Sequence, residues 1–232
     1  LPQLTESWAD TVTIHHLLSH TSGVVRTDKP LAFSPGSAFA YSNLGFELLA
    51  KCIENASGQS FAALSMALFK KCSMHNSFYP DSTLGQHPVT GYTAQEDGSV
   101  QPEHGNLSGH AASGTFISTA ADLVKWNNCL HGGKLLSAAS YQAMITKKEK
   151  AVREHPVFGL QDYGYGITTS GQGSHLQLGQ TGLIPGFVCM DFYYPASQTS
   201  IVVLENVAWS AGDIKEMFYY HLPVLQLALA IH

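Results

Sequence analysis

The stretch Phe187-Val-Cys-Met-Asp-Phe-Tyr-Tyr-Pro-Ala-Ser-Gln-Thr-Ser-Ile-Val-Val-Leu-Glu-Asn206 decides the fold class of this chain. It contains two runs rich in aromatic and β-branched residues, Phe187–Tyr194 and Ser200–Asn206, separated by a short turn. Such a turn leaves no room for a crossover helix, so the runs predict neighbouring antiparallel strands. Similar runs precede them at Tyr163–Thr168 and His175–Gln180. The last third of the chain therefore predicts an antiparallel sheet.

Before the sheet, the spacing of apolar residues is helical and each expected helix has a start signal. We expect helices over Ile14–Ser19 with Thr13 as cap and Gly23 as stop, from about Leu44 to Ala56 ending at Gly58, from Ser60 onward, from a capping box at Thr119-Ala-Ala-Asp122, and from Ser137 through Met144. After the sheet, Ser210 is expected to cap one further helix whose apolar side is formed by Ile214, Met217, Phe218, Leu222 and Leu225.

These elements predict an α+β fold, a helical lobe beside an antiparallel β-sheet with the C-terminal helix packed on it. No internal repeat, low-complexity run or linker interrupts the chain. We therefore expect one partial domain over residues 1–232, with a mainly helical lobe over 1–160 and the sheet plus C-terminal helix over 161–232.

Composition excludes several classes of protein. The 232 residues carry 12 Lys+Arg against 17 Asp+Glu, a formal charge of −5, which argues against binding to a phosphate backbone. The most apolar stretch, Leu222–Ile231, is far below the roughly 20 residues that a membrane span needs. No basic and apolar leader precedes Leu1, so the sequence is expected to be a mature protein or a fragment.

The cysteines and histidines do not form a metal-binding pattern. Cys52, Cys72, Cys129 and Cys189 include no Cys-x-x-Cys pair, and the close group His15, His16 and His20 has no carboxylate or Cys at ligand spacing. We predict neither a metal nor another cofactor. Four thiols permit disulfides in an oxidising compartment but do not require them.

Three short segments carry more polar and small residues than plain structure needs. They are His16-Leu-Leu-Ser-His-Thr-Ser-Gly23, Pro35-Gly-Ser-Ala-Phe-Ala-Tyr-Ser-Asn-Leu-Gly45 and Gly179-Gln-Thr-Gly-Leu-Ile-Pro-Gly-Phe187. Each has an ordinary structural interpretation: a helix end with its loop, a helix cap at Asn43 beside a core Tyr41, and a bulged edge strand. Their joint occurrence in this order favours a functional one.

Together the segments resemble the serine β-lactamase and penicillin-binding protein superfamily, in particular the class C β-lactamase-related branch with its D-Ala-D-Ala carboxypeptidases and family VIII esterases. Leu17–Gly23 matches the His-Leu-Leu-x-His-Thr-Ser-Gly stretch and Tyr41-Ser42-Asn43 the Tyr-x-Asn element. Ala112–Leu123 resembles a further family stretch, and Gln180-Thr181-Gly182 stands at the Lys/His-Thr-Gly strand motif. The resemblance covers essentially the whole chain.

Two departures from the family pattern concern the chemistry directly. The family nucleophile is the Ser of a Ser-x-x-Lys motif upstream of these segments, and no Ser here has Lys three residues later. We expect that the nucleophile segment was cut away, lies on another chain, or was never part of this product. Gln180 replaces the usual Lys or His, so position 180 supplies no positive charge.

The resemblance implies acyl-enzyme chemistry on amide or ester bonds of a peptidoglycan-type peptide, a β-lactam or a small ester. It implies Tyr41 as proton shuttle and Asn43 as the group that holds the missing Lys or a substrate carbonyl. The N–H of Leu183 would be one oxyanion donor, and Gln180, Thr181 and Gly182 would line the substrate strand. This chain alone is expected to be inactive.

The resemblance also implies partners and a location. We expect a small-molecule or peptide substrate, and the missing N-terminal segment as a partner acting in trans. An extracytoplasmic bacterial location, periplasmic or secreted, is expected. The rival hypothesis is a catalytically inactive binding protein that keeps the cleft, and a Ser-x-x-Lys motif in the sequence upstream of Leu1 would decide against it. An α/β-hydrolase is disfavoured because no Gly-x-Ser-x-Gly occurs.

Overall fold

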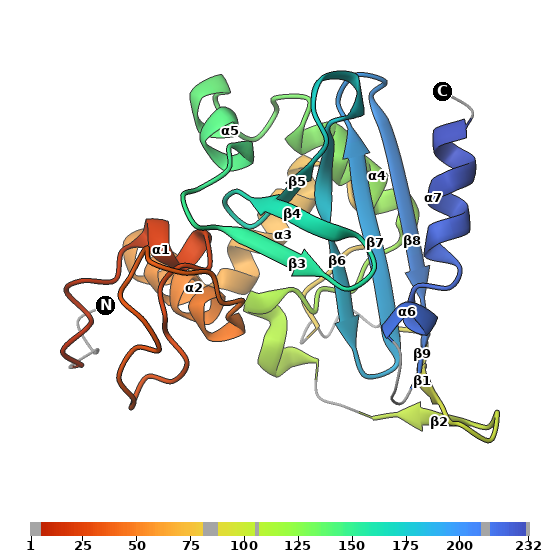
Figure 1. Cartoon of the computed structure of the whole chain (residues 1–232), viewed down its shortest axis with the longest axis horizontal. Helices are drawn as coiled ribbons and strands as arrows, with labels where there is room; N and C mark the ends of the chain where they lie inside the picture. Colours follow the sequence, from red (N-terminus) through yellow and green to blue (C-terminus); the bar gives the residue numbers. More distant parts are fainter. Residues whose placement is uncertain (1–5, 81–87, 105–106, 210–213, 231–232) are drawn as a thin grey trace.

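The sheet that the sequence predicts is the centre of the computed structural model, which describes residues 6–80, 88–104, 107–209 and 214–230 (Figure 1). Six strands pair antiparallel in the order β3-β4-β5-β6-β7-β8. Their bounds are β3 Val152–His155, β4 Gly159–Tyr163, β5 Thr168–Ser170, β6 Gln177–Ile184, β7 Phe187–Tyr194 and β8 Thr199–Glu205. Helices cover both faces, so the α+β expectation is confirmed.

The five helices expected before the sheet form, and each is capped by Ser or Thr. The helices are α1 Ile14–Leu18, α2 Asn43–Ser57, α3 Phe61–Lys71, α4 Ala120–Leu130 and α5 Ala138–Ile145. Their caps accept a backbone N–H through the side-chain oxygens of Thr13, Ser42, Ser60, Thr119 and Ser137. The expected stop of the first helix at Gly23 is wrong, because Ser19 already ends α1 as its C-terminal cap. Gly58 ends α2 in the left-handed region at φ 67°.

Only one of the two hydrogen bonds of the capping box expected at Thr119 forms. Thr119 accepts the N–H of Asp122, but the Asp122 carboxylate bonds elsewhere. It accepts the N–H of Asn76 at 2.7 Å, the hydroxyl of Ser77 at 3.0 Å and the ammonium of Lys125 at 2.6 Å. The carboxylate therefore ties α4 to the segment after α3 and does not close the helix end.

The strand expected over Tyr163–Thr168 is wrong, because a corner lies there. Tyr163 ends β4 and Thr168 begins β5, with Gly166 at φ +70° between them. The expected His175–Gln180 strand begins later, since a 3₁₀ turn, η2 Gly173–His175, precedes β6. The sheet also starts earlier than residue 161, since β3 was not predicted and β4 spans the expected boundary.

A second, smaller sheet was not predicted. It contains β1 Gly91–Ala94, β2 Val100–Glu103 and β9 Val207–Trp209 in the order β2-β1-β9. Strands β1 and β2 pair antiparallel, whereas β1 and β9 are parallel. Strands β1 and β2 are joined by a short turn that the sequence analysis did not recognise. Strand β9 lies far from β1 in the sequence, so no tight turn marks that pairing.

The expected C-terminal helix is broken into two pieces, α6 Ile214–Met217 and α7 His221–Ala230. Its expected cap, Ser210, lies outside the described residues. Leu225 of α7 packs against Met190 and Phe192 of β7, so the helix does lie on the sheet. Within the described chain no helix has the length and apolar character to cross a bilayer.

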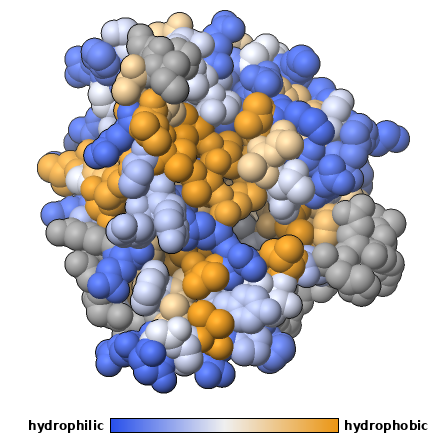
Figure 2. Space-filling model, turned by 90° about the vertical axis from the view of Figure 1, so that its right-hand side faces the viewer, coloured by the Kyte–Doolittle hydropathy of each residue, from blue (hydrophilic) through white to orange (hydrophobic). Residues whose placement is uncertain are grey.

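The outer side of α7 remains apolar and exposed. Figure 2 shows hydrophobic residues gathered on the face of the molecule that carries this helix. The exposed apolar side chains there include Val224, Leu227 and Leu229, of which Leu227 is 67% exposed. The opposite face of the sheet is covered by α4, whose Asn127 reaches Asp191 of β7.

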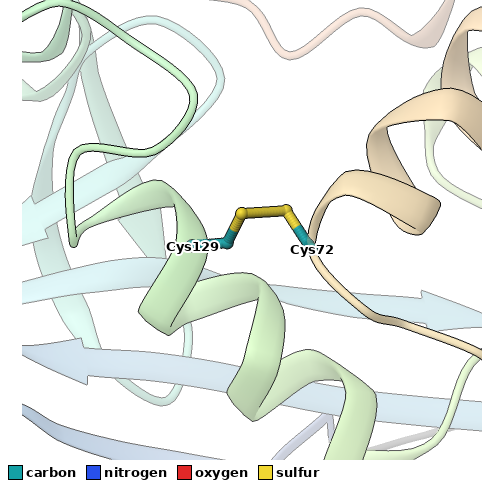
Figure 3. Close-up of a disulfide and its surroundings, with 2 residues drawn as sticks. All are labelled: Cys72 and Cys129. Carbon is teal, nitrogen blue, oxygen red and sulfur yellow. A yellow bond between two sulfur atoms is a disulfide. The ribbon is translucent and has the colours of Figure 1, made fainter.

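A disulfide joins two helices of the helical lobe (Figure 3). Cys72, which ends α3, bonds to Cys129 of α4 across a Cα–Cα distance of 5.6 Å. Both residues are buried with Phe69 and Met74 in one apolar cluster. Cys52 and Cys189 are free thiols. The pairing that the sequence left open is therefore Cys72 with Cys129.

Candidate active site

The His-Thr-Ser-Gly turn after α1 is a buried polar scaffold. Four consecutive polar residues, Ser19 to Ser22, are at most 1% exposed. Their groups are paired within the turn, for example the Ser19 and Thr21 hydroxyls at 2.9 Å. Gly23 adopts φ +74°, and a Cβ there would lie 2.5 Å from the carbonyl oxygen of Phe33. The turn is thus fixed by its own hydrogen bonds and by close packing.

This scaffold holds the loop that carries Tyr41. The N–H of Ala40 bonds to the carbonyl of His20 at 2.9 Å, and the N–H of Ser42 bonds to His20 Nδ1 at 3.1 Å. The Ser42 hydroxyl donates to the carbonyl of Val24. The rings of His20 and Tyr41 lie 4.2 Å apart. Tyr41 is therefore positioned by a buried histidine, although the residue as a whole is 53% exposed.

Tyr41 and Asn43 both line a hollow of about 220 Å³ whose other walls come from residues 23–25, Ala32, Ala40, Ser42 and Leu44. Asn43 is the first residue of α2, and Ser42 rather than Asn43 is its cap. The Asn43 side chain is exposed and has no hydrogen bond to the described part of the chain. It is available to a ligand or to another segment.

Strand β6 presents an edge beside this loop. Strand β5 pairs with β6 only at Gln177, Leu178 and Gly179, so from Gln180 to Ile184 the described strands pair with β6 on the β7 side alone. A Cβ at Gly182 would lie 2.6 Å from the sulfur of Cys189, so only glycine fits over that thiol. Leu183 is 42% exposed. An extended peptide can pair with such an edge.

The Gln180 amide is engaged at both ends. Its Oε1 accepts a hydrogen bond from Arg153 Nη1 at 2.9 Å, and its Nε2 donates to the hydroxyl of Tyr163 at 2.7 Å. The same Tyr163 hydroxyl lies 3.1 Å from His20 Nε2. Because His20 Nδ1 accepts from Ser42, its Nε2 carries the proton and donates to Tyr163. Gln180 thus connects the β6 edge to the Tyr41 scaffold.

Arg153 places a cation at the centre of this cluster. Its guanidinium lies over the Tyr41 ring, 5.6 Å from the centroid. Burial, assisted by this cation, lowers the pKa of His20 to about 4, so His20 is neutral at neutral pH. Loss of water around the hydroxyl raises the pKa of Tyr41 above its ordinary value, and Arg153 opposes this only partly. In the structure Tyr41 is therefore a protonated phenol.

A second histidine, His155 of β3, orients Thr181. His155 Nδ1 accepts the backbone N–H groups of Val157 and Phe158, so its Nε2 carries the proton and donates to Thr181 Oγ1 at 3.1 Å. Burial, with Arg153 contributing, lowers the pKa of His155 to about 4. The Thr181 hydroxyl accepts this bond and can give its own proton to another group.

The structure thus brings Tyr41 and Gln180 into one cluster through Arg153, and Asn43 lies beside Tyr41 at the same hollow. Thr181, Gly182 and Leu183 continue along the β6 edge. No group of three metal-ligating side chains occurs in the part of the chain that the structure describes.

Sequence reasoning missed four residues of the cluster: Arg153, His155, Tyr163 and the role of His20. Only His20 had a signal, its place in the first motif.

The fold is that of the serine β-lactamase and penicillin-binding protein superfamily. The chain belongs to the Beta-lactamase family, whose family model matches residues 1–226.

Its similarity to individual members is low but spans most of the chain. PbpX of Bacillus subtilis (strain 168), whose name places it among the penicillin-binding proteins, is 24% identical over 90% of this chain and 55% of its own length. The D-aminopeptidase of Brucella ovis is 22% identical over 85% of this chain and 37% of its own length. The chain spans about half or less of the length of these two relatives.

Solved structures show the same fold. A penicillin-binding protein from Bacillus halodurans superposes with a TM-score of 0.76 at 27% identity, covering 99% of this chain and 78% of that one. The D-amino acid amidase of Ochrobactrum anthropi SV3, in complex with L-phenylalanine amide, gives a TM-score of 0.79 at 22% identity, with 98% and 73% covered.

Proposed function

We propose that this chain supplies the substrate cleft of a serine hydrolase that acts by acyl transfer on an amide or ester bond. The nucleophilic Ser and its Lys come from a Ser-x-x-Lys segment outside this sequence. The observation that carries the proposal is the cluster of Tyr41, Arg153 and Gln180 at the open edge of β6. A tyrosine, a cation and an unpaired strand edge are the parts that position and protonate a peptide-like substrate.

Each proposed site residue has a role in this reaction. Tyr41 transfers the proton between the nucleophile and the leaving group. Because its pKa is raised, it needs the nearby Lys of the missing segment to become a base. Asn43 holds that Lys or a substrate carbonyl. The N–H of Leu183 is an oxyanion donor, and Gln180, Thr181 and Gly182 line the strand along which the substrate extends.

The substrate class is proposed from the named relatives. These include penicillin-binding proteins, a D-aminopeptidase and a D-amino acid amidase. A peptide with D-configured residues, a β-lactam or a small ester fits the same edge. Carboxypeptidase and esterase activities are the forms of this chemistry to assay first.

We place the protein outside the bacterial cytoplasm. The disulfide between Cys72 and Cys129 supports this location, because such bonds persist mainly in oxidising compartments. The upstream segment is proposed as the partner that completes the site, either in the same chain or in trans.

A second candidate is a binding protein without catalysis. It is favoured by one specific observation: no Ser of the sequence is followed by Lys three residues later. Such a protein would bind the same peptides at β6 and release them unchanged.

The test uses the longer protein that includes the sequence upstream of Leu1. Incubation with a fluorescent penicillin followed by mass spectrometry should show one acylated Ser in a Ser-x-x-Lys motif. Tyr41→Phe should slow this acylation by roughly 10²-fold or more, the usual contribution of a proton-transfer group. Tyr220→Phe is the matched control, at a residue that is 64% exposed next to α7. This change should leave the acylation rate unaltered. Reversible binding without any acylated Ser would establish the binding protein instead.

A further inference from the structure

We propose that Tyr163 is a positioning residue of the cleft, whose buried hydroxyl holds the loop of Tyr41 and strand β6 in a fixed relation to each other. This inference deepens the proposed function and rests on it, because it concerns the same reaction. In this role Tyr163 does not touch the substrate. It acts through His20 on one side and through Gln180 on the other.

The main chain of Tyr163 is held on both sides. Its N–H bonds to the carbonyl of Ala151 at 2.9 Å, and its carbonyl accepts the N–H of Lys148 at 3.0 Å. Gly164 follows directly, and a Cβ there would lie 2.1 Å from the carbonyl oxygen of Met144, so the corner after β4 is closely packed. Tyr163 itself is only 1% exposed. Its hydroxyl is therefore a rigid point in the interior.

Two groups that can only donate fix the direction of both hydrogen bonds to this hydroxyl. Arg153 Nη1 donates to Gln180 Oε1 at 2.9 Å, so the amide turns its Nε2 toward the Tyr163 hydroxyl, 2.7 Å away. The N–H of Ser42 donates to His20 Nδ1 at 3.1 Å, so the neutral ring carries its proton on Nε2, 3.1 Å from the same hydroxyl. The Tyr163 oxygen therefore accepts two hydrogen bonds, one from each side of the cleft.

The two donors lead to opposite neighbours of Tyr41. The ring of His20 lies 4.2 Å from the ring of Tyr41. Gln180 supports Arg153, whose guanidinium lies 5.6 Å from the centroid of the Tyr41 ring. Without the Tyr163 hydroxyl, both neighbours would lose a support. Proton transfer needs a group held within hydrogen-bond reach, and a displacement of about 1 Å can cost roughly 10²-fold in rate.

A hydroxyl that only stabilises the fold is the alternative, and the chain offers a matched example of one. The hydroxyl of Tyr194 on β7 donates to Gln177 Oε1 at 2.5 Å, and Tyr194 is also buried. Gln177 is the first residue of β6, where β5 still pairs with this strand, so the pair lies away from the open edge. Removing either tyrosine hydroxyl breaks a tyrosine–glutamine bond in the same sheet, but only Tyr163 connects to the cleft.

Loss of the Tyr163 hydroxyl should slow the reaction without weakening binding. The backbone of β6 pairs with β7 in register from Leu178 to Ile184, and this pairing does not involve Tyr163. A ligand along β6 therefore keeps its strand edge. Tyr41, in contrast, loses the fixed surroundings that proton transfer requires.

The experiment uses the longer protein that includes the sequence upstream of Leu1 and follows acylation by a fluorescent penicillin. Stopped-flow measurements over a range of penicillin concentrations give the dissociation constant of the non-covalent complex and the acylation rate constant separately. In Tyr163→Phe the rate constant should fall roughly tenfold to a hundredfold, while the dissociation constant stays nearly unchanged. Tyr194→Phe, the matched loss of a buried tyrosine hydroxyl, should keep both values.

A double-mutant cycle with Gln180→Met tests whether Tyr163 acts through the amide. Both changes remove the bond between Tyr163 and Gln180, so their effects on the rate constant should not be independent. The double variant should be about as slow as Tyr163→Phe alone.

Three results would overturn the positioning role and leave the proposed function intact: equal rate constants in Tyr163→Phe and Tyr194→Phe, a loss of affinity in Tyr163→Phe as large as its loss of rate, or losses that multiply in the double variant. Absence of any acylated Ser in the unmutated protein would contradict the proposed function and this inference with it. If Tyr163→Phe does not fold, the nitrogen chemical shifts of His20 in the unmutated protein decide. A proton on Nε2 supports the bond pattern at Tyr163, and a proton on Nδ1 overturns it.

Discussion

Replacing Asp191 by Asn should stabilise the protein at neutral pH. Asp191 lies on β7 opposite Gln180, beneath the proposed cleft, and its carboxylate accepts a hydrogen bond from Asn127 Nδ2 at 2.6 Å. Burial raises its pKa from 3.8 to about 6, and the Asn127 bond offsets this only in part. An Asn at this position still accepts the Asn127 bond through its amide oxygen but carries no charge.

The sign and size of the stabilisation expected for Asp191→Asn follow from the raised pKa of Asp191. Because the folded pKa lies above the unfolded one, the stability contributed by the protonated carboxyl is fully present below pH 3.8 and is lost as the pH rises through about 6. Each tenfold difference in proton affinity is worth about 1.4 kcal/mol, so ionising Asp191 in the fold costs up to about 3 kcal/mol at neutral pH.

The assay is urea unfolding of the unmutated protein and Asp191→Asn at pH 4 and pH 7.5. Other titrating groups cancel in the difference between the two proteins. That difference should favour the variant by up to about 3 kcal/mol at pH 7.5 and nearly vanish at pH 4. Asp97→Asn is the control, since the pKa of this exposed carboxyl is lowered by its bonds to Ser99. A difference that is equal at both pH values, or favours Asp191 at pH 7.5, would refute the reasoning.

Three further predictions concern other parts of the structure. Removing the disulfide by replacing Cys72 and Cys129 with Ser should lower the unfolding free energy by about 4 kcal/mol in the chain-entropy estimate for a 57-residue separation, and unfolding with and without reductant measures it. Gly182→Ala should lower the melting temperature, and adding Cys189→Ala should recover much of the loss, because the new Cβ lies 2.6 Å from that sulfur. The lowered pKa of His155 means that its contribution to stability is present above pH 6.5 and is lost as the pH falls through about 4. His155→Gln should therefore lose less stability than the unmutated protein over that interval, and an equal loss in both would contradict the lowered pKa of His155.

The elements that sequence predicted well have strong local signals. Phe187–Tyr194 forms β7 with the predicted bounds, because its aromatic and β-branched residues lie between two partner strands with short turns. The helix starts were predicted correctly because Ser and Thr act as caps through local bonds.

The strands and site residues that the sequence did not predict were missed for physical reasons too. Val152–His155 did not read as a strand because Arg153 and Glu154 are charged and the strand pairs on one side only. Tyr163–Thr168 has strand-like composition, but Gly166 turns the chain there. Tyr41 and Gln180, which family motifs mark, both contact Arg153, and their roles in a site stay a prediction. Arg153 has no motif, since its contact with Gln180 depends on how β3 folds across the sheet, 27 residues away in sequence.

We propose that this chain provides the cleft while the nucleophile comes from a segment outside it. The most direct measurement is intact-mass spectrometry of the 232-residue chain after incubation with a fluorescent penicillin and with a fluorophosphonate, alone and joined to the natural upstream sequence. We expect no adduct on the chain alone and one adduct, on the Ser of a Ser-x-x-Lys motif, in the joined protein. Stoichiometric labelling of any Ser within the 232 residues would contradict it.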